Sequence, residues 1–127
     1  MDKQVVVASA APEPAGPYSQ GVRCGELLFV AGQVPIEPRS GAVPEGIAEQ
    51  TRQALRNVAS IVEAAGGSLA DVVKTTVFMA DLGEYAAMNE VYATFFPQRP
   101  PARACVQVAR LPRDARVEVE AVAGLPR

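Results

Sequence analysis

The chain has 127 residues and a formal net charge of −2, and 49% of its residues are hydrophobic and 20% charged. This length and balance predict a single soluble domain over residues 1–127 with its own hydrophobic core. The net negative charge disfavours nucleic acid as a partner, and no segment approaches the roughly 20 apolar residues of a membrane span. We therefore expect a cytoplasmic protein that has no membrane partner.

Strand-like and helix-like segments follow one another along the chain in the order hairpin, helix, strand, helix, strand, strand. Gly25-Glu26 separates two short apolar runs and predicts a hairpin turn. Gly66-Gly67 predicts the end of a helix that begins near residue 47. Asp81 is the expected cap of a second helix, because Glu84 follows three residues later. The expected elements in chain order are strands over 5–8, 22–24 and 27–31, a helix over 47–65, a strand over 72–79, the second helix, and strands that hold Arg103 and Glu118.

The second helix carries an apolar stripe that we interpret as its inner face. Asn89 lies on this stripe, one turn from each of the two tyrosines there. The stripe consists of Tyr85, Met88, Tyr92 and Phe95 or Phe96.

The strand over 72–79 is rich in β-branched residues and largely apolar on both faces, which indicates a strand that is covered on both sides. Strand–helix–strand units favour parallel neighbouring strands, and two helices can cover only one face of such a sheet. We therefore predict that other copies of the chain cover the second face. The alternative is a face rich in Val and Thr that contacts water.

The residue types limit the chemistry that this chain can perform. The chain has no histidine, which excludes Ser–His and Cys–His nucleophile pairs and the commonest metal ligand. Cys24 and Cys105 are too far apart for a CxxC motif, so we expect buried thiols and neither a disulfide framework nor a zinc site. No glycine-rich segment has the spacing of a phosphate-binding loop. The remaining polar groups can bind a small carboxylate and orient a water molecule, so we predict no cofactor and no metal.

Two charged residues lie within the last two predicted strands. Small apolar residues flank Arg103, and two valines flank Glu118. A guanidinium matches a carboxylate with two parallel hydrogen bonds, and a carboxylate held by a strand can orient a water molecule. The pair predicts a small pocket for a substrate that is itself a carboxylate. The alternatives are a structural ion pair or two charges that face water.

Five segments together resemble the RidA/YjgF family of reactive-intermediate deaminases. The resemblance implies a chorismate-mutase-like α+β fold, with a mixed sheet of about six strands, two helices on one face, and a homotrimer with clefts between subunits. It also implies the hydrolysis of 2-imino acids, such as 2-iminobutanoate and 2-iminopropanoate, to 2-keto acids and ammonia, which protects pyridoxal-phosphate enzymes. The segments are 16–21, 31–33, 73–78, 101–103 and 117–121.

The resemblance also implies roles for single residues. Arg103 would bind the substrate carboxylate, and Glu118 would position or activate the attacking water. The residues implied to line the cleft are Tyr18, Gly32, Asn89 and Cys105. Without a histidine to activate it, Cys105 is interpreted as a lining residue. The structural alternatives are an Arg103 ion pair with Glu118 or Glu120, a Tyr18 ring packed on the core, and an Asn89 amide bonded to backbone.

Three other functions compete with this one. The first is a non-catalytic protein that senses a small carboxylate or acts as a chaperone-like trimer. The second is an RNA-directed, translation-inhibiting role, which the charge and the absence of histidine disfavour. The third is deamination of aminoacrylate-type intermediates or of aminomuconate.

Overall fold

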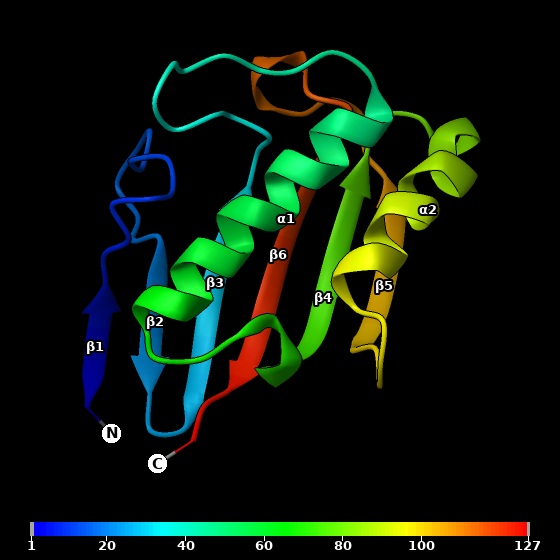
Figure 1. Cartoon of the computed structure of the whole chain (residues 1–127). Coiled ribbons are helices and arrows are strands. Elements are labelled where there is room, and N and C mark those ends of the chain that lie inside the picture. Colours follow the sequence, from blue (N-terminus) through cyan, green and yellow to red (C-terminus); the bar gives the residue numbers. More distant parts are fainter. Residues whose placement is uncertain (1, 127) are drawn as a thin grey trace.

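A computed structural model describes residues 2–126 as one six-stranded sheet with two α-helices packed on one of its faces (Figure 1). Three short 3-10 turns, η1 (Leu69–Asp71), η2 (Leu82–Glu84) and η3 (Pro112–Asp114), lie in the connections. The strands and helices are β1 (Lys3–Val6), β2 (Gly21–Cys24), β3 (Leu27–Gln33), α1 (Ile47–Ala64), β4 (Val72–Met79), α2 (Tyr85–Phe95), β5 (Ala102–Gln107) and β6 (Val117–Gly124).

The strand order in the sheet is β1-β2-β3-β6-β4-β5. The pair β4–β5 is parallel and the other pairs are antiparallel, so the sheet is mixed as predicted. The unit β4–α2–β5 places parallel strands side by side, as expected for a helical crossover. The unit β3–α1–β4 differs, because β6 lies between its two strands.

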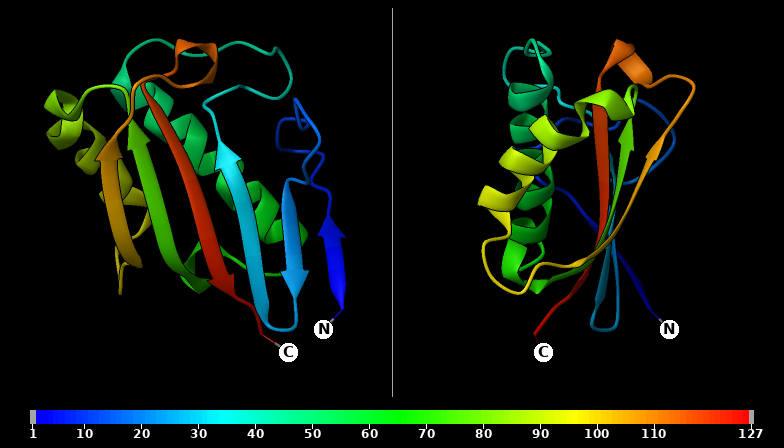
Figure 2. Two further views of the ribbon diagram at one scale, coloured as in Figure 1. Left: turned by 180° about the vertical axis from the view of Figure 1, so that it is seen from behind. Right: turned by 90° about the vertical axis from the view of Figure 1, so that its right-hand side faces the viewer.

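The hydrophobic core lies between the sheet and the two helices (Figure 2, right). Alternate residues of β6 point into it, as the period of two in a strand requires. Leu55, Val58 and Ile61 of α1 are fully buried against them. The residues of β6 on this side are Val117, Val119, Ala121 and Ala123.

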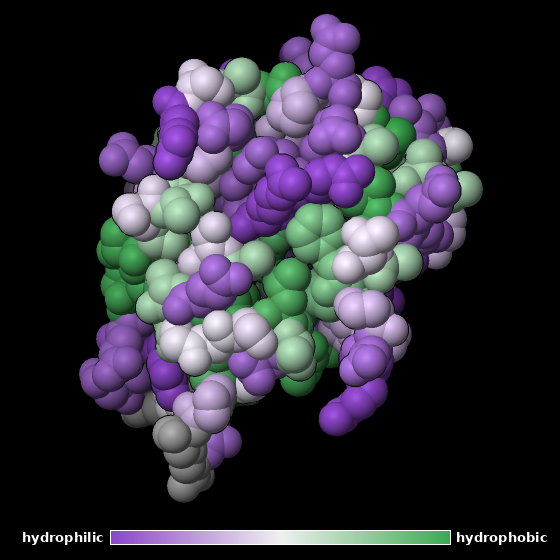
Figure 3. Space-filling view, in the orientation of Figure 1, coloured by the Kyte–Doolittle hydropathy of each residue, from purple (hydrophilic) through white to green (hydrophobic). Residues whose placement is uncertain are grey.

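The opposite face of the sheet has no helix over it (Figure 2, left). Phe29 of β3 and Val73 of β4 lie at this face, and their exposed fractions are 47% and 52%, respectively. The helix-bearing face differs, because hydrophilic residues gather across its middle and upper part (Figure 3). The open face is therefore the part of the surface that remains for the predicted contact with other copies.

Most element bounds agree with the expected ones to within one or two residues, and two differences have a clear physical cause. The expected strand over 5–8 is β1 at Lys3–Val6, because Ala8 belongs to a loop that the Gln20 side chain binds. Asp81 caps the 3-10 turn η2, where its Oδ1 accepts a hydrogen bond from Gly83 N, and α2 begins only at Tyr85.

Candidate active site

The predicted site residues fall into two groups on opposite faces of the sheet. Arg103 pairs in register with Thr75, which is fully buried on the helix side of β4. Glu118 pairs with Phe78, which alternates to the open side. The structure therefore corrects one expectation: Arg103 and Glu118 do not share a pocket within one chain. The same geometry excludes an ion pair between Arg103 and Glu118, or between Arg103 and Glu120, within the chain.

The first group, here called the arginine half-site, lies between β5 and α2 and consists of Arg103, Cys105, Asn89, Tyr85 and Tyr92. Nη2 of Arg103 donates a hydrogen bond of 2.8 Å to the hydroxyl of Tyr85. Its Cζ lies 4.7 Å from the ring centroid of Tyr92, a cation–π contact. The Tyr92 hydroxyl is itself held by Thr75 Oγ1 at 2.7 Å.

Arg103 has no carboxylate partner among residues 2–126, whose ion pairs all involve other arginines. Aromatic rings and a hydroxyl hold the guanidinium in place, and none of them neutralises its charge. A cation held in this way is suited to bind an anionic ligand.

Cys105 and Asn89 complete the arginine half-site. Cys105 pairs with Val77 two residues beyond Arg103, so both side chains lie on the same face. Burial raises the pKa of the Cys105 thiol, and this effect outweighs the opposite effect of the Arg103 charge. The thiol therefore stays protonated at neutral pH and is a poor nucleophile. Asn89 is half-buried and is assigned to the half-site by its spacing alone, because it lies one helical turn from both Tyr85 and Tyr92.

The second group, here called the glutamate half-site, consists of Glu118, Gly32 and Tyr18. These residues line one cavity of about 570 Å³, whose other polar lining residues are Glu13, Gln20, Gln33 and Arg113. A Cβ on Gly32 would overlap Oε2 of Glu118. The Glu118 carboxylate therefore occupies space that any side chain at position 32 would fill.

Tyr18 lies on the loop before β2, with 51% of its surface exposed. Its hydroxyl accepts a hydrogen bond of 3.2 Å from the backbone N–H of Ala15. The alternative in which its ring packs on the core is therefore not what the structure has.

The Glu118 carboxyl has a pKa above its ordinary value. The main cause is burial, which disfavours the charged form, and the charge of Glu120 on the same face of β6 adds to it. A carboxylate whose pKa is raised toward neutral pH is a better acceptor for the proton of a water molecule.

Gln20 fixes the loop that carries Tyr18. The side chain is buried, with only 4% exposed, and its Oε1 accepts a hydrogen bond of 2.7 Å from Ala8 N. Its Nε2 donates to the carbonyl oxygens of Ala8, Ala11 and Pro12. Gln20 of the 16–21 segment thus stabilises the loop by hydrogen bonds to its backbone.

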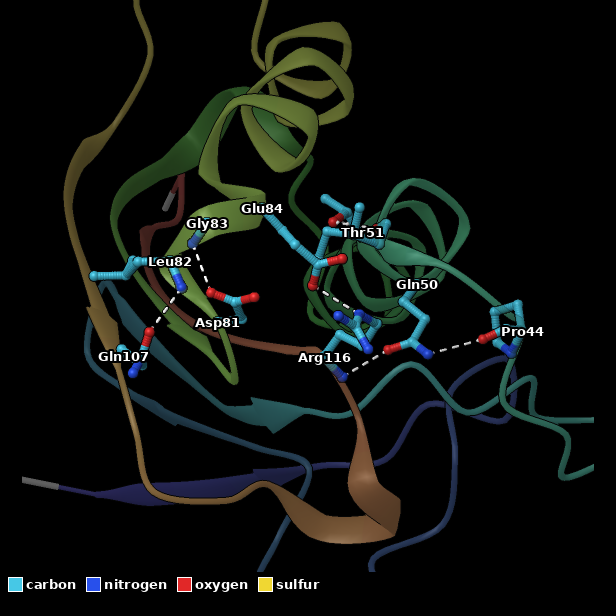
Figure 4. Close-up of polar contacts among 10 residues, drawn as sticks. Pro44, Gln50, Thr51, Asp81, Leu82, Gly83, Glu84, Gln107 and Arg116 are labelled. Carbon is cyan, nitrogen blue, oxygen red and sulfur yellow. Dashed lines mark hydrogen bonds and ion pairs between the residues drawn. The ribbon is translucent and has the colours of Figure 1, made fainter.

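A polar cluster ties the beginning of β6 to both helices (Figure 4). Nε of Arg116 lies 2.6 Å from Oε1 of Glu84, the residue before α2. The backbone N–H of Arg116 donates to Gln50 of α1, whose Nε2 donates to the carbonyl of Pro44. Because Arg116 precedes Glu118 by two residues and Glu84 precedes Tyr85, this cluster fixes the two half-sites relative to each other.

The sequence predicts Tyr85 on the inner stripe, yet 42% of its surface is exposed and its hydroxyl contacts Arg103. Helical spacing shows which residues share a face of the helix, but it does not show at which turn that face becomes buried. The useful signal was the crossover itself, since β5 follows α2 directly and brings Arg103 beside the helix.

Within the described residues no three His, Cys, Asp or Glu side chains are grouped as a metal site would require. None of the helices over residues 2–126 is long and apolar enough to cross a membrane.

Comparisons with known proteins cover nearly the whole chain. The model of the family described as Endoribonuclease L-PSP matches residues 8–125. A RutC family protein of Pyrococcus horikoshii is 51% identical over 122 residues, 95% of this chain and 97% of the relative. The 2-iminobutanoate/2-iminopropanoate deaminase of Escherichia coli is 47% identical over 123 residues, 94% of this chain and 96% of the relative. The crystal structure of Escherichia coli TdcF with bound serine superposes with a TM-score of 0.94 at 44% identity, covering 97% of this chain and 99% of that chain.

Proposed function

The chain belongs to the Endoribonuclease L-PSP family, which is the RidA/YjgF family of its deaminase relatives, and on this premise we propose that it hydrolyses 2-imino acids. The substrates would be 2-iminobutanoate and 2-iminopropanoate, and the products 2-keto acids and ammonia. The observation that carries the proposal is the state of Arg103, a cation held by two tyrosines without a carboxylate partner in residues 2–126. Removal of such imino acids would protect pyridoxal-phosphate enzymes from them.

The functional assembly would be a homotrimer. Arg103 and Glu118 lie on opposite faces of one sheet, so a single chain offers each of them to a different neighbour. A complete site would join the arginine half-site of one subunit to the glutamate half-site of the next. The exposed Phe29 and Val73 on the open face support burial of this face against another copy.

The proposed reaction needs only water as co-substrate. Arg103 binds the carboxylate and fixes the orientation of the adjacent carbon C2. The imine reacts in its protonated form, and Glu118 accepts a proton from a water molecule as the water oxygen bonds to C2 and the C=N electron pair moves to nitrogen. Glu118 then gives this proton to the nitrogen of the resulting carbinolamine. The C2–N bond breaks as the hydroxyl proton passes to Glu118, which gives the 2-keto acid and ammonia. Transfer of that proton to the ammonia releases ammonium and leaves Glu118 ionised.

The activity is tested with threonine and a threonine dehydratase that releases the enamine/imine. Its decay is followed with and without this protein. We expect faster decay with the wild type and none of this acceleration with Arg103→Ala. Arg52→Ala is the matched control, because Arg52 makes only a surface pair with Glu49 at 3.5 Å. A well-folded wild type that does not accelerate decay would refute the proposal and favour a carboxylate sensor.

The shared site is tested by mixing two inactive variants, Arg103→Ala and Glu118→Gln. In a mixed trimer, one cleft combines an intact Arg103 from one subunit with an intact Glu118 from the other. Random reassembly at equal amounts should therefore restore about a quarter of the wild-type activity. Mixtures that stay inactive after confirmed subunit exchange would contradict a site built from two subunits.

A further inference from the structure

Tyr85 belongs to the arginine half-site and has no role in the reaction proposed above. It is the first residue of α2, and its hydroxyl oxygen accepts a hydrogen bond from Nη2 of Arg103 at 2.8 Å. Its ring centroid is 5.5 Å from Arg103 Cζ. Tyr92 lies closer, at 4.7 Å, but its hydroxyl is turned to Thr75 Oγ1 in the interior. Tyr85 therefore makes the hydrogen bond of 2.8 Å to the guanidinium, whereas Tyr92 contributes mainly its ring, because its hydroxyl interacts with Thr75 as well as with Arg103.

This contact limits how Arg103 can bind a carboxylate. A guanidinium offers two paired edges, one formed by Nε and Nη2 and the other by Nη1 and Nη2. Each edge uses a different hydrogen of Nη2. Because Tyr85 takes one of these hydrogens, one edge is interrupted and the other remains complete. The carboxylate is left with a single direction of approach.

The same contact leaves Tyr85 with a free donor. Its oxygen accepts from Arg103, so its own hydrogen stays available to a group bound beside the guanidinium. Tyr85 is exposed enough for a ligand to reach this hydrogen, with 42% of its surface accessible.

We propose that Tyr85 is a positioning residue, which selects the edge of Arg103 that binds the substrate carboxylate and donates a further hydrogen bond to that carboxylate. The inference rests on the proposed function, in which Arg103 binds a 2-imino acid. In this role, Tyr85 makes the site bind a carboxylate more tightly than a neutral ligand of the same shape.

The test measures the binding of 2-oxobutanoate and of its neutral amide, 2-oxobutanamide, by titration calorimetry of the assembled protein. Tyr85→Phe should raise the Kd of 2-oxobutanoate about tenfold, as expected for the loss of a hydrogen bond to a charged group. The Kd of the amide and the Tm should stay at their wild-type values. Thr94→Val is the matched control, because it removes an exposed hydroxyl of the same helix that donates to the carbonyl of Val91. It should leave the Kd of 2-oxobutanoate and the preference for the carboxylate unchanged.

Arg103→Ala separates this inference from the proposed function. If Arg103→Ala binds 2-oxobutanoate as the wild type does, Arg103 is not the carboxylate site and the proposed function fails. If Arg103→Ala loses binding while Tyr85→Phe keeps the wild-type Kd and preference, the role of Tyr85 is refuted and that of Arg103 stands.

Discussion

Replacing Gly32 with alanine tests whether the position of the Glu118 carboxylate determines the rate. The new Cβ would overlap Oε2 of Glu118 and lie 3.0 Å from its Cδ. The overlapped atom is the end of a flexible side chain, so rotation of Glu118 relieves the clash without movement of the backbone. The carboxylate would shift by about 1 Å, and a misplacement of that size can cost about 100-fold in rate. We therefore expect kcat to fall by about 100-fold.

The fold should tolerate this change. Gly32 does not have a positive φ angle, and alanine restricts the unfolded chain, so the Tm should stay equal or rise slightly. The assay is the dehydratase-coupled decay of the imine, together with thermal unfolding. Gly124→Ala on β6 is the matched control, because its Cβ would meet only Val73 Cγ1 at 3.9 Å. A folded Gly32→Ala protein with wild-type kcat would refute the reasoning.

Three further outcomes follow from the site. If Glu118 is the base, kcat/KM should fall as pH drops through its raised pKa, and Glu120→Gln should move this acid limb to lower pH in a pH–rate profile. A raised pKa means that Glu118 contributes stability at low pH that is lost as pH rises through this value; Glu118→Gln should therefore raise the Tm at pH 7 and lose this advantage in acid. Gln20→Ala leaves the buried N–H of Ala8 without its acceptor and should lower the free energy of unfolding by about 1–3 kcal/mol in urea titrations, whereas the exposed Gln4→Ala should change little.

Local patterns predicted most elements because their causes are local. The β-branched run over 72–79 coincides with β4, and the helix over 47–65 differs from α1 by one residue. The hairpin turn at Gly25-Glu26 is present, with Gly25 at φ 62°. The position of β6 between β3 and β4 was not predicted, because it depends on pairing between segments distant in the sequence.

The site was predicted as a set of residues and not as an arrangement. Alternation within a strand shows that Arg103 and Cys105 lie on one face of β5, and that Glu118 and Glu120 lie on one face of β6. It does not show whether these faces are the same, because that depends on the registers of β5 and β6 against β4. Tyr85 is placed on the inner stripe by helical spacing, and this spacing does not reveal that its hydroxyl is exposed and bonds Arg103.

The place of β6 in the sheet has a consequence for how the protein is made. A chain synthesised only as far as residue 116 holds β1–β3 and β4–β5 as two separate pieces, with unpaired edges on β3 and β4. Such edges can pair with other unfinished chains, so this stage is the one most exposed to aggregation. The strand that closes the sheet also carries Glu118. The pairing of β6 with β3 and β4 therefore also places the candidate base in its cavity.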